Sequence, residues 1–306
     1  MKYIQIIMIA TLGAAICSCN RDELFEREQY KNVFALLSEG SFNIFAEEHD
    51  LGNEETEGYV SAVCGGSLPT HTEINIAMVE DEDILLRYNR SNFDVDEDRY
   101  AQLLPRDRYD IEDLNITVPA GERKGLMKIR IHPDGLSPDS AYFIPLRADR
   151  FSAYELNPDK SYLLYRVLIK NFYAAQKTVT QYQLRGKRDG VSLMQTKDVY
   201  PVGGNKIRIS AGDLTCDATK YEEINRTAIV VEVNEEDGHV TITPWKDIVV
   251  TQVHGDPDYP NIFKIENDGY KSYKTFLLCY DYEYEGITVS MQEELRLEYN
   301  EKKEQN

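Results

Sequence analysis

The chain has 306 residues and carries 34 Lys and Arg against 53 Asp and Glu, which gives a formal net charge of −19 at pH 7. This balance disfavours nucleic acid as a partner, because neutralising phosphates requires clustered cations, and it disfavours electrostatic docking on anionic lipid. The hydrophobic fraction of 42% is sufficient for packed cores, and the length favours about two domains.

The N-terminal segment has the pattern of a secretory signal. Its apolar run, residues 4–16, is too short for an ordinary membrane span. The window Ile16-Cys17-Ser18-Cys19 is similar to a bacterial lipobox and places Cys19 where the lipid is attached. We therefore expect residues 1–18 to be a signal peptide, Cys19 to be lipidated and residues 19–29 to form a charged tether. The alternative is ordinary signal cleavage with a free Cys19.

The link to a membrane is expected to be this lipid anchor alone. No second apolar run reaches the roughly 18 to 20 residues that a transmembrane helix needs. Three cysteines remain beyond the signal: Cys64, Cys216 and Cys279. One disulfide among them is possible in an oxidising compartment, but no CxxC or zinc spacing occurs, and buried free thiols are favoured.

In the first half of the chain, apolar and polar residues alternate over short stretches. This period of two predicts strands at residues 74–78 and 127–131, and a further strand at 116–118 that runs into a Pro-Gly turn. Long polar connections separate such strands, the longest spanning residues 81–109. Since no long stretch shows a helical period, we expect a nearly all-β chain that begins with a Greek-key sandwich.

The second half favours an antiparallel meander. An apolar strand at residues 163–169 precedes it, and two hairpins follow, turning at Asp237-Gly238 and at Glu285-Gly286. Consecutive hairpins of this kind often close into a barrel. Along the last hairpin, Tyr280, Tyr282 and Tyr284 alternate on one strand face and are interpreted as barrel lining.

No motif for catalysis or for a cofactor occurs in the sequence. The five histidines are scattered, and there is no zinc spacing, nucleophile elbow, P-loop or dinucleotide fingerprint. The acidic run at residues 94–98 lacks the Gly and Glu of a calcium loop and is interpreted as a solvated loop. Asp256-Pro257-Asp258 is interpreted as a surface turn. We therefore expect no cofactor and no metal.

Two aromatic residues in the second half are candidates for ligand binding. Trp245 follows Pro244 at the end of a predicted strand, and Tyr259 lies between two prolines on a predicted loop. An aromatic face can serve as a platform for a sugar ring. The alternative for Trp245 is that it closes the end of the barrel or packs in a core.

Several motifs of the first half resemble an immunoglobulin-like N-terminal domain that is common in Bacteroidetes lipoproteins of polysaccharide-utilisation loci. That domain also precedes some endo-glycosidases. The region from about 171 to 295 looks like the lipocalin-like domain that accompanies it. The resemblance implies an immunoglobulin-like β-sandwich over residues 30–170 and a lipocalin-like antiparallel β-barrel over 171–306. The motifs that carry it are Tyr88-Asn89, Leu103-Leu104-Pro105, Tyr109, Ile116–Gly121, Leu136-Ser137 and Tyr142–Leu146.

The resemblance also implies a compartment. Asn20-Arg21-Asp22-Glu23 is similar to the acidic export signals of such lipoproteins, so we expect the protein at the outer membrane, displayed on the cell surface. The resemblance supplies no catalytic residues. The leading hypothesis is a non-catalytic binding protein for glycan or for a partner of the glycan-uptake machinery. The alternatives are a carrier of a small apolar ligand in the barrel, a glycosidase, and a structural or adhesin role.

Overall fold

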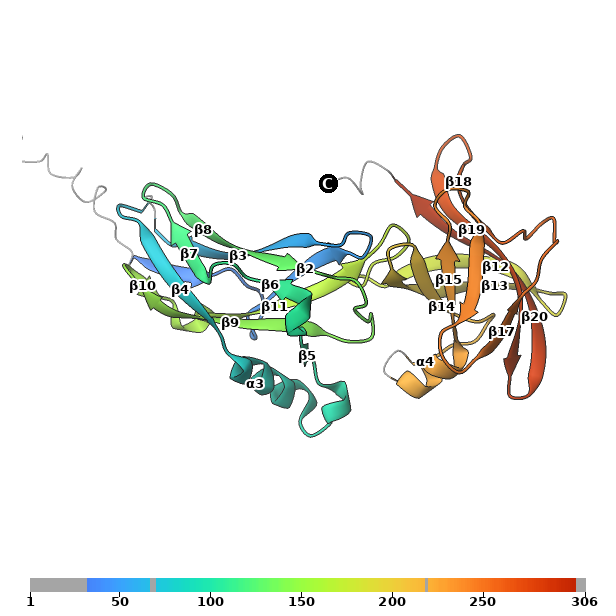
Figure 1. The fold of residues 1–306 in the computed structure, drawn as a ribbon, viewed down its shortest axis with the longest axis horizontal. Helices are drawn as coiled ribbons and strands as arrows, with labels where there is room; N and C mark the ends of the chain where they lie inside the picture. Colours follow the sequence, from blue (N-terminus) through green and yellow to red (C-terminus); the bar gives the residue numbers. More distant parts are fainter. Residues whose placement is uncertain (1–31, 67–69, 218–219, 301–306) are drawn as a thin grey trace, which may run out of the picture.

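The computed structural model describes residues 32–66, 70–217 and 220–300. The signal peptide, the lipidation at Cys19 and the tether predicted above lie outside these residues. The described chain folds into two β-domains arranged end to end (Figure 1). No helix in the described part is both long and apolar enough to cross a membrane. The helices are α3 (Glu82–Phe93) and α4 (Tyr221–Thr227), with short 3-10 turns at Glu97–Arg99, Arg106–Arg108 and Pro158–Lys160.

The first domain is an immunoglobulin-like β-sandwich. Its strand order is β10-β1-β3-β8-β7-β4-β9-β11-β2, and the β7–β4 pairing joins its two halves. β5 pairs with β9 and β6 pairs with β8. The strands are β1 (Val33–Leu36), β2 (Ile44–Asp50), β3 (Thr56–Cys64), β4 (Ile74–Glu80), β5 (Gln102–Leu103), β6 (Tyr109–Asp110), β7 (Asn115–Val118), β8 (Lys124–Ile131), β9 (Tyr142–Phe151), β10 (Glu155–Leu156) and β11 (Tyr162–Lys170).

The alternating residues of the first half form the core of this sandwich, as predicted. On β8, Met127, Ile129 and Ile131 are buried, whereas Lys128 between them is exposed. The same alternation buries every second residue of β4 and β7. Because the strand period is two, one face of each strand contributes the apolar area that stabilises the packed halves. The predicted strand at residues 163–169 is β11, which pairs in parallel with β2.

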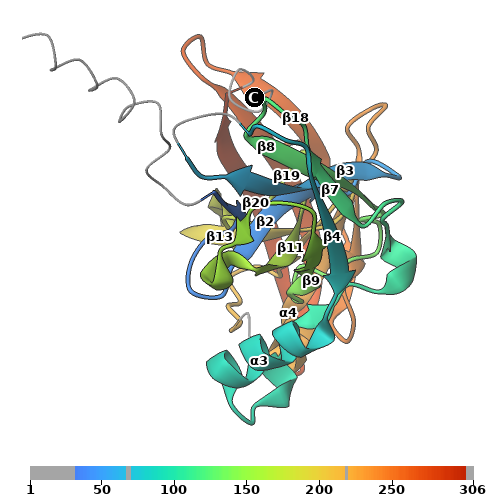
Figure 2. The same ribbon diagram turned by 90° about the vertical axis from the view of Figure 1, so that its left-hand side faces the viewer.

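The expectation of a connection without a helix over residues 81–109 was wrong, because α3 lies within it. The carboxylate of Asp81 accepts a hydrogen bond from the backbone N–H of Asp83 (3.2 Å) and so caps the helix. Ile84 and Leu85 are buried on its inner face, in a small core that includes Phe143. The helix continues from the end of β4 and lies outside the sandwich (Figures 1 and 2). Its apolar stripe is only about three turns long, too short to stand out as a helical period.

The second domain is a lipocalin-like antiparallel barrel. Its strand order is β16-β15-β14-β13-β12-β20-β19-β17, with β18 pairing with β19. Both predicted hairpins are confirmed. β15 and β16 pair in antiparallel fashion on either side of Asp237-Gly238, and at the other turn Glu285 and Gly286 have φ angles of 53° and 77°, as a tight hairpin turn requires. The strands are β12 (Thr180–Arg188), β13 (Val191–Gly203), β14 (Lys206–Ser210), β15 (Ala228–Val233), β16 (Val240–Pro244), β17 (Val249–Gln252), β18 (Ile262–Asn267), β19 (Ser272–Tyr284) and β20 (Ile287–Tyr299).

A side chain joins the first and last strands of this order. The amide oxygen of Gln252 on β17 accepts a hydrogen bond from the backbone N–H of Ile242 on β16 (2.9 Å). The amide nitrogen of Gln252 donates to the backbone oxygen of Val240, which also lies on β16 (2.8 Å). Gln252 thus satisfies two main-chain groups at the seam of the barrel, beside the backbone bridge between His239 and Ile262.

Side chains fill the interior of the barrel. Tyr280 and Tyr282 are buried in its core and Tyr284 lies partly buried against it, which confirms that they line the barrel. At one end, Tyr173 packs against Phe263, with ring centroids 4.9 Å apart. At the other end, the backbone N–H of Gly212 donates to the hydroxyl of Tyr280 (2.7 Å). This packing disfavours the hypothesis of a carrier, which requires room for an apolar ligand.

Candidate functional site

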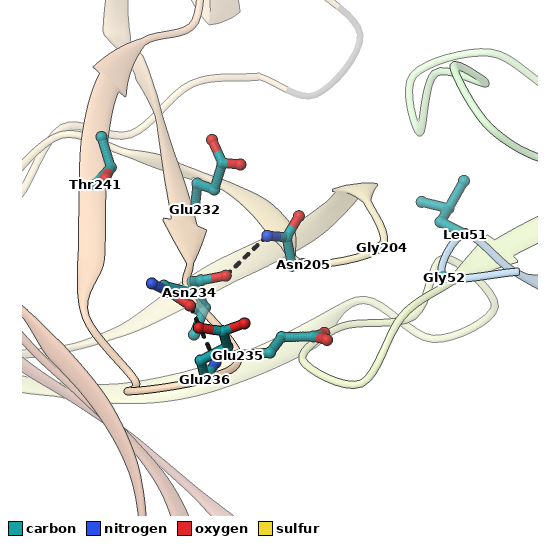
Figure 3. Close-up of a pocket in the computed structure, with 10 residues that line it drawn as sticks. Leu51, Gly52, Gly204, Asn205, Glu232, Asn234, Glu235, Glu236 and Thr241 are labelled. Atoms are coloured by element: carbon teal, nitrogen blue, oxygen red, sulfur yellow. Dashed lines mark hydrogen bonds between the residues drawn. The ribbon is translucent and has the colours of Figure 1, made fainter.

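A cleft of about 750 Å³, open to solvent, lies where the two domains meet. Figure 3 shows the turn after β2 on one side, facing the β13–β14 turn and the end of β15 on the other. A Cβ atom on Gly204 would lie only 2.8 Å from the Cα atom of Gly52, so the two main chains touch at the base of the cleft. The lining residues are Leu51, Gly52, Gly204, Asn205, Glu232, Val233, Asn234, Glu235, Glu236 and Thr241.

Hydrogen bonds fix the main chain of the barrel side of this cleft. The amide nitrogen of Asn205 donates to the backbone oxygen of Val233 (2.8 Å), which ties the β13–β14 turn to β15. The amide oxygen of Asn234 accepts the backbone N–H of Glu236 (3.0 Å) and shapes the turn that follows β15. These bonds hold two turns from different hairpins in one fixed wall.

The carboxylates of the cleft differ in how they are engaged. Glu232 forms an ion pair with Lys206, with Nζ 3.2 Å from Oε2. Glu235 and Glu236 are exposed, and among the described residues neither carboxylate takes part in a hydrogen bond or an ion pair. Burial, together with the charge of Glu235, raises the pKa of the nearby Tyr173 to about 12. The cleft therefore offers acceptor oxygens to a ligand, and its field is negative.

Trp245, the first predicted ligand-binding residue, does not line the cleft. It is half-buried directly after β16, and its ring lies over the guanidinium group of Arg208, 5.0 Å from centroid to Cζ. It lies four positions after Thr241, which corresponds to about 13 Å along a strand. The structure therefore places Trp245 at the contact between the domains, on the outer face of the barrel.

Tyr259, the second predicted ligand-binding residue, lies in the loop between β17 and β18. It is half-buried, and burial raises the pKa of its hydroxyl. Its backbone N–H and that of Asp258 donate to the carboxylate of Asp256 (3.1 and 2.9 Å). These bonds lower the pKa of Asp256, which caps its own loop. The structure does not bring Tyr259 and Trp245 together with the cleft.

Metal-ligating and redox groups are sparse in the described chain. No three His, Cys, Asp or Glu residues within it are grouped so that they could hold a metal ion. Cys64, Cys216 and Cys279 are free thiols; Cys64 and Cys279 are buried and Cys216 is half-buried. The chemistry that this site offers is therefore hydrogen bonding by carboxylates and amides.

The sequence did not single out the residues that line the cleft. Asp237-Gly238 was predicted only as a hairpin turn, and several residues of the cleft lie in this connection and in the turn between β13 and β14. Their role at the cleft depends on where the barrel meets the sandwich. A polar turn rich in Glu and Asn is the only signal in the sequence, and many solvated turns share it.

Comparisons with known proteins agree with this architecture. One family model, for an N-terminal domain, matches residues 28–155, and its C-terminal counterpart matches residues 161–296. No curated protein matches the chain. The C-terminal match begins at 161 and so includes β11, which pairs within the sheet of the first domain.

Solved structures from Bacteroides share the fold at low identity. One of unknown function from Bacteroides ovatus is 15% identical, has a TM-score of 0.61 and covers 87% of this chain and 94% of its own. A multidomain protein including DUF1735 from the same species is 16% identical, with a TM-score of 0.59 and coverages of 88% and 95%. An auxiliary nutrient binding protein from Bacteroides thetaiotaomicron is 17% identical, with a TM-score of 0.54 and coverages of 83% and 90%. The chain therefore belongs to the two-domain family in which an immunoglobulin-like N-terminal domain precedes a lipocalin-like C-terminal domain.

Proposed function

We propose that this protein is a non-catalytic, lipid-anchored binding protein that captures a neutral glycan at the cell surface, in the cleft between its domains. The observation that carries the proposal is the set of polar groups in that cleft, above all the exposed carboxylates of Glu235 and Glu236. One of the proteins with a similar fold, from Bacteroides thetaiotaomicron, is described as an auxiliary nutrient binding protein, which is a similar role.

The chemistry of the cleft suits a ligand rich in hydroxyl groups. A carboxylate accepts hydrogen bonds at two oxygens, and an amide side chain both donates and accepts. Hydrogen bonds to ionised groups are the stronger kind, so each carboxylate can hold a sugar hydroxyl. The three glutamates of the cleft and the overall charge of −19 repel anionic polysaccharides. A neutral chain is therefore the favoured ligand.

The position of the anchor is consistent with capture outside the membrane. β1 and β10 lie at the end of the first domain that is remote from the second domain (Figure 1). A lipid on Cys19 would therefore tether the protein at that end. The first domain would act as a spacer that holds the cleft away from the membrane, and a partner of the uptake machinery could approach the second domain.

The test is a glycan array with the chain from Asn20 onward, which contains every described strand. We expect saturable binding to a neutral glycan, and weaker binding when Glu235→Gln and Glu236→Gln are combined. Glu285→Gln, in the exposed turn at the far end of β19, is the matched control. The same incubations are analysed for shortened glycan. A glycosidase needs two carboxylates that flank the glycosidic bond, so this measurement tests whether the carboxylates of the cleft act in that way.

Three results would count against the proposal. Absence of binding to every glycan would shift the role to a protein partner, and release of shortened glycan would establish catalysis. Trp245→Ala and Tyr259→Ala are measured alongside, since both residues were proposed from the sequence. Binding that depends on either of them and not on the cleft glutamates would move the site to the outer face of the barrel.

A further inference from the structure

The strongest polar contact between the two domains is an ion pair between Arg208 of the barrel and Asp139 of the sandwich. Its two hydrogen bonds are short, with Nη1 2.5 Å from Oδ2 and Nη2 2.6 Å from Oδ1. The side chains are only 3% and 10% exposed. This two-point geometry fixes the orientation of both groups as well as their distance.

Aromatic side chains enclose this pair. The guanidinium carbon of Arg208 lies 5.1 Å from the ring centroid of Tyr200 and 5.0 Å from that of Trp245. The hydroxyl of Tyr221 donates to the backbone oxygen of Asp139 (3.2 Å). A planar guanidinium group can stack on aromatic faces while it donates in its own plane, which an ammonium group cannot.

The pair is connected to the cleft through one short strand. β14 begins at Lys206, directly after the turn that contains Gly204 and Asn205, and Arg208 is its third residue. The distance from Arg208 to that turn is therefore about 10 Å along the strand. A change in the position of Arg208 relative to the first domain must move the barrel wall of the cleft relative to the turn that carries Gly52.

The other contacts between the domains lie mostly at or near the linker, where Gln176 donates to the backbone oxygens of Pro138 and Ser140 (2.9 and 3.3 Å). Gly52 and Gly204 touch through main-chain atoms, which prevents closer approach and does not prevent separation. Asn171 donates to the backbone oxygens of Gly203 and Lys206 (2.7 and 2.8 Å), and it acts at the linker, where a rotation would begin. A directional contact remote from the linker is needed to fix the angle between the domains.

We infer that Arg208 and Asp139, with Trp245 stacked on the guanidinium group, are positioning residues that hold the two walls of the cleft at a fixed separation. Removing one member leaves a buried charge without its partner, which strongly opposes the docked arrangement. The consequence for ligand binding rests on the function proposed above. The positioning role itself does not, because it concerns the angle between the domains.

The test measures that angle without any ligand. Arg90→Cys on α3 and Lys187→Cys on β12, both exposed sites, carry nitroxide labels in a chain with Cys216→Ser. Double electron–electron resonance then reports the distribution of distances between the domains. We expect one narrow distribution in the parent chain, and loss of that single narrow peak in Asp139→Asn and in Arg208→Lys. Asp213→Asn is the matched control, because it breaks an ion pair within the barrel, Arg188–Asp213 at 2.9 Å.

Each outcome decides the inference. Broad distributions in Asp139→Asn and Arg208→Lys, with a narrow one in the control, support it. Distributions as narrow as in the parent chain overturn it, because the linker and glycine contacts would then suffice. Circular dichroism checks folding, and loss of folding in both variants also overturns it, since the pair would then be required for the fold itself. If the parent chain binds no glycan while the two variants still show the expected broadening, only the proposed function is refuted.

Discussion

Lys197 and Glu293 form an ion pair inside the barrel, with Nζ 2.5 Å from Oε2 and side-chain exposures of 3% and 0%. The second carboxylate oxygen of Glu293 accepts the hydroxyl of Tyr280 (2.8 Å). Burial lowers the pKa of Lys197, and the charge of Glu293 opposes that shift. The pair is thus part of a hydrogen-bonded core and lies out of reach of a ligand in the cleft.

Lys197→Met is expected to lower the free energy of unfolding by about 3–5 kcal/mol, because it leaves the Glu293 carboxylate buried and unpaired. The double variant Lys197→Met with Glu293→Gln should recover part of this loss, since a neutral amide still accepts the Tyr280 hydroxyl. Urea unfolding measures the free energy of unfolding of the single and the double variant. Equal losses in the single and double variants would contradict this account of the pair.

Gly204→Ala is expected to weaken the contact between the domains. Its Cβ atom would lie 2.8 Å from the Cα of Gly52, and main-chain atoms cannot move aside locally. The loss of stability should be about 1–3 kcal/mol, as for overpacked sites. Gly65→Ala is the control, because the nearest atom to its Cβ would be 3.4 Å away. Thermal unfolding compares the two; equal losses would show that the glycine contact is not tight.

Gln252→Leu tests how the barrel is closed. The substitution removes the partners of the Ile242 N–H and the Val240 oxygen at the seam. We expect a loss of about 2–4 kcal/mol for two groups left unsatisfied, and faster hydrogen exchange at Ile242. In Gln252→Glu, a carboxylate oxygen can still accept the backbone N–H of Ile242, so this N–H should stay protected against exchange. Only the hydrogen bond to the oxygen of Val240 should be lost. Unchanged exchange at Ile242 in the leucine variant would contradict this role.

The stability of the first domain should fall in mild acid because of His49. Its two ring nitrogens are hydrogen-bonded to Thr56 (2.8 Å) and Tyr165 (3.0 Å), and the Tyr165 hydroxyl donates to Glu47. Burial lowers the pKa of His49 from 6.5 to about 4. The unfolded chain therefore binds the proton more readily than the folded chain does.

The contribution of His49 to stability is therefore complete above pH 6.5 and is lost as the pH falls toward 4. It amounts to about 3 kcal/mol at most, from the size of the shift. Urea unfolding between these pH values should show a smaller slope with pH in His49→Gln than in the parent chain. Parallel slopes would show that other groups cause the acid sensitivity.

Much of the fold could be predicted from local patterns. The alternation at residues 127–131 fixed the buried face of β8, and Glu285-Gly286 located the last hairpin. These signals are local, because strand burial and turn geometry depend on neighbouring residues. α3 was missed because Ile84 and Leu85 are too few to establish a helical period.

The site could not be predicted in the same way. Arg208 stands between Ile207 and Ile209, a pattern that indicates only an outward polar residue on a strand. That its guanidinium group meets Asp139, 69 residues away in the other domain, depends on how two finished domains dock. The acidic cleft arises from the same docking. Trp245 was singled out as a candidate platform for a sugar, whereas its ring lies over Arg208 of the same domain, whose guanidinium group is engaged by Asp139 of the other.

The central claim is that the cleft between the domains binds a neutral glycan, and calorimetric titration with the best array ligand tests it most directly. The parent chain and Glu285→Gln should bind with the same affinity. The variant with both Glu235→Gln and Glu236→Gln should bind at least about tenfold more weakly, since two charge-assisted hydrogen bonds lose their charge. Equal affinity in all three proteins would contradict the claim.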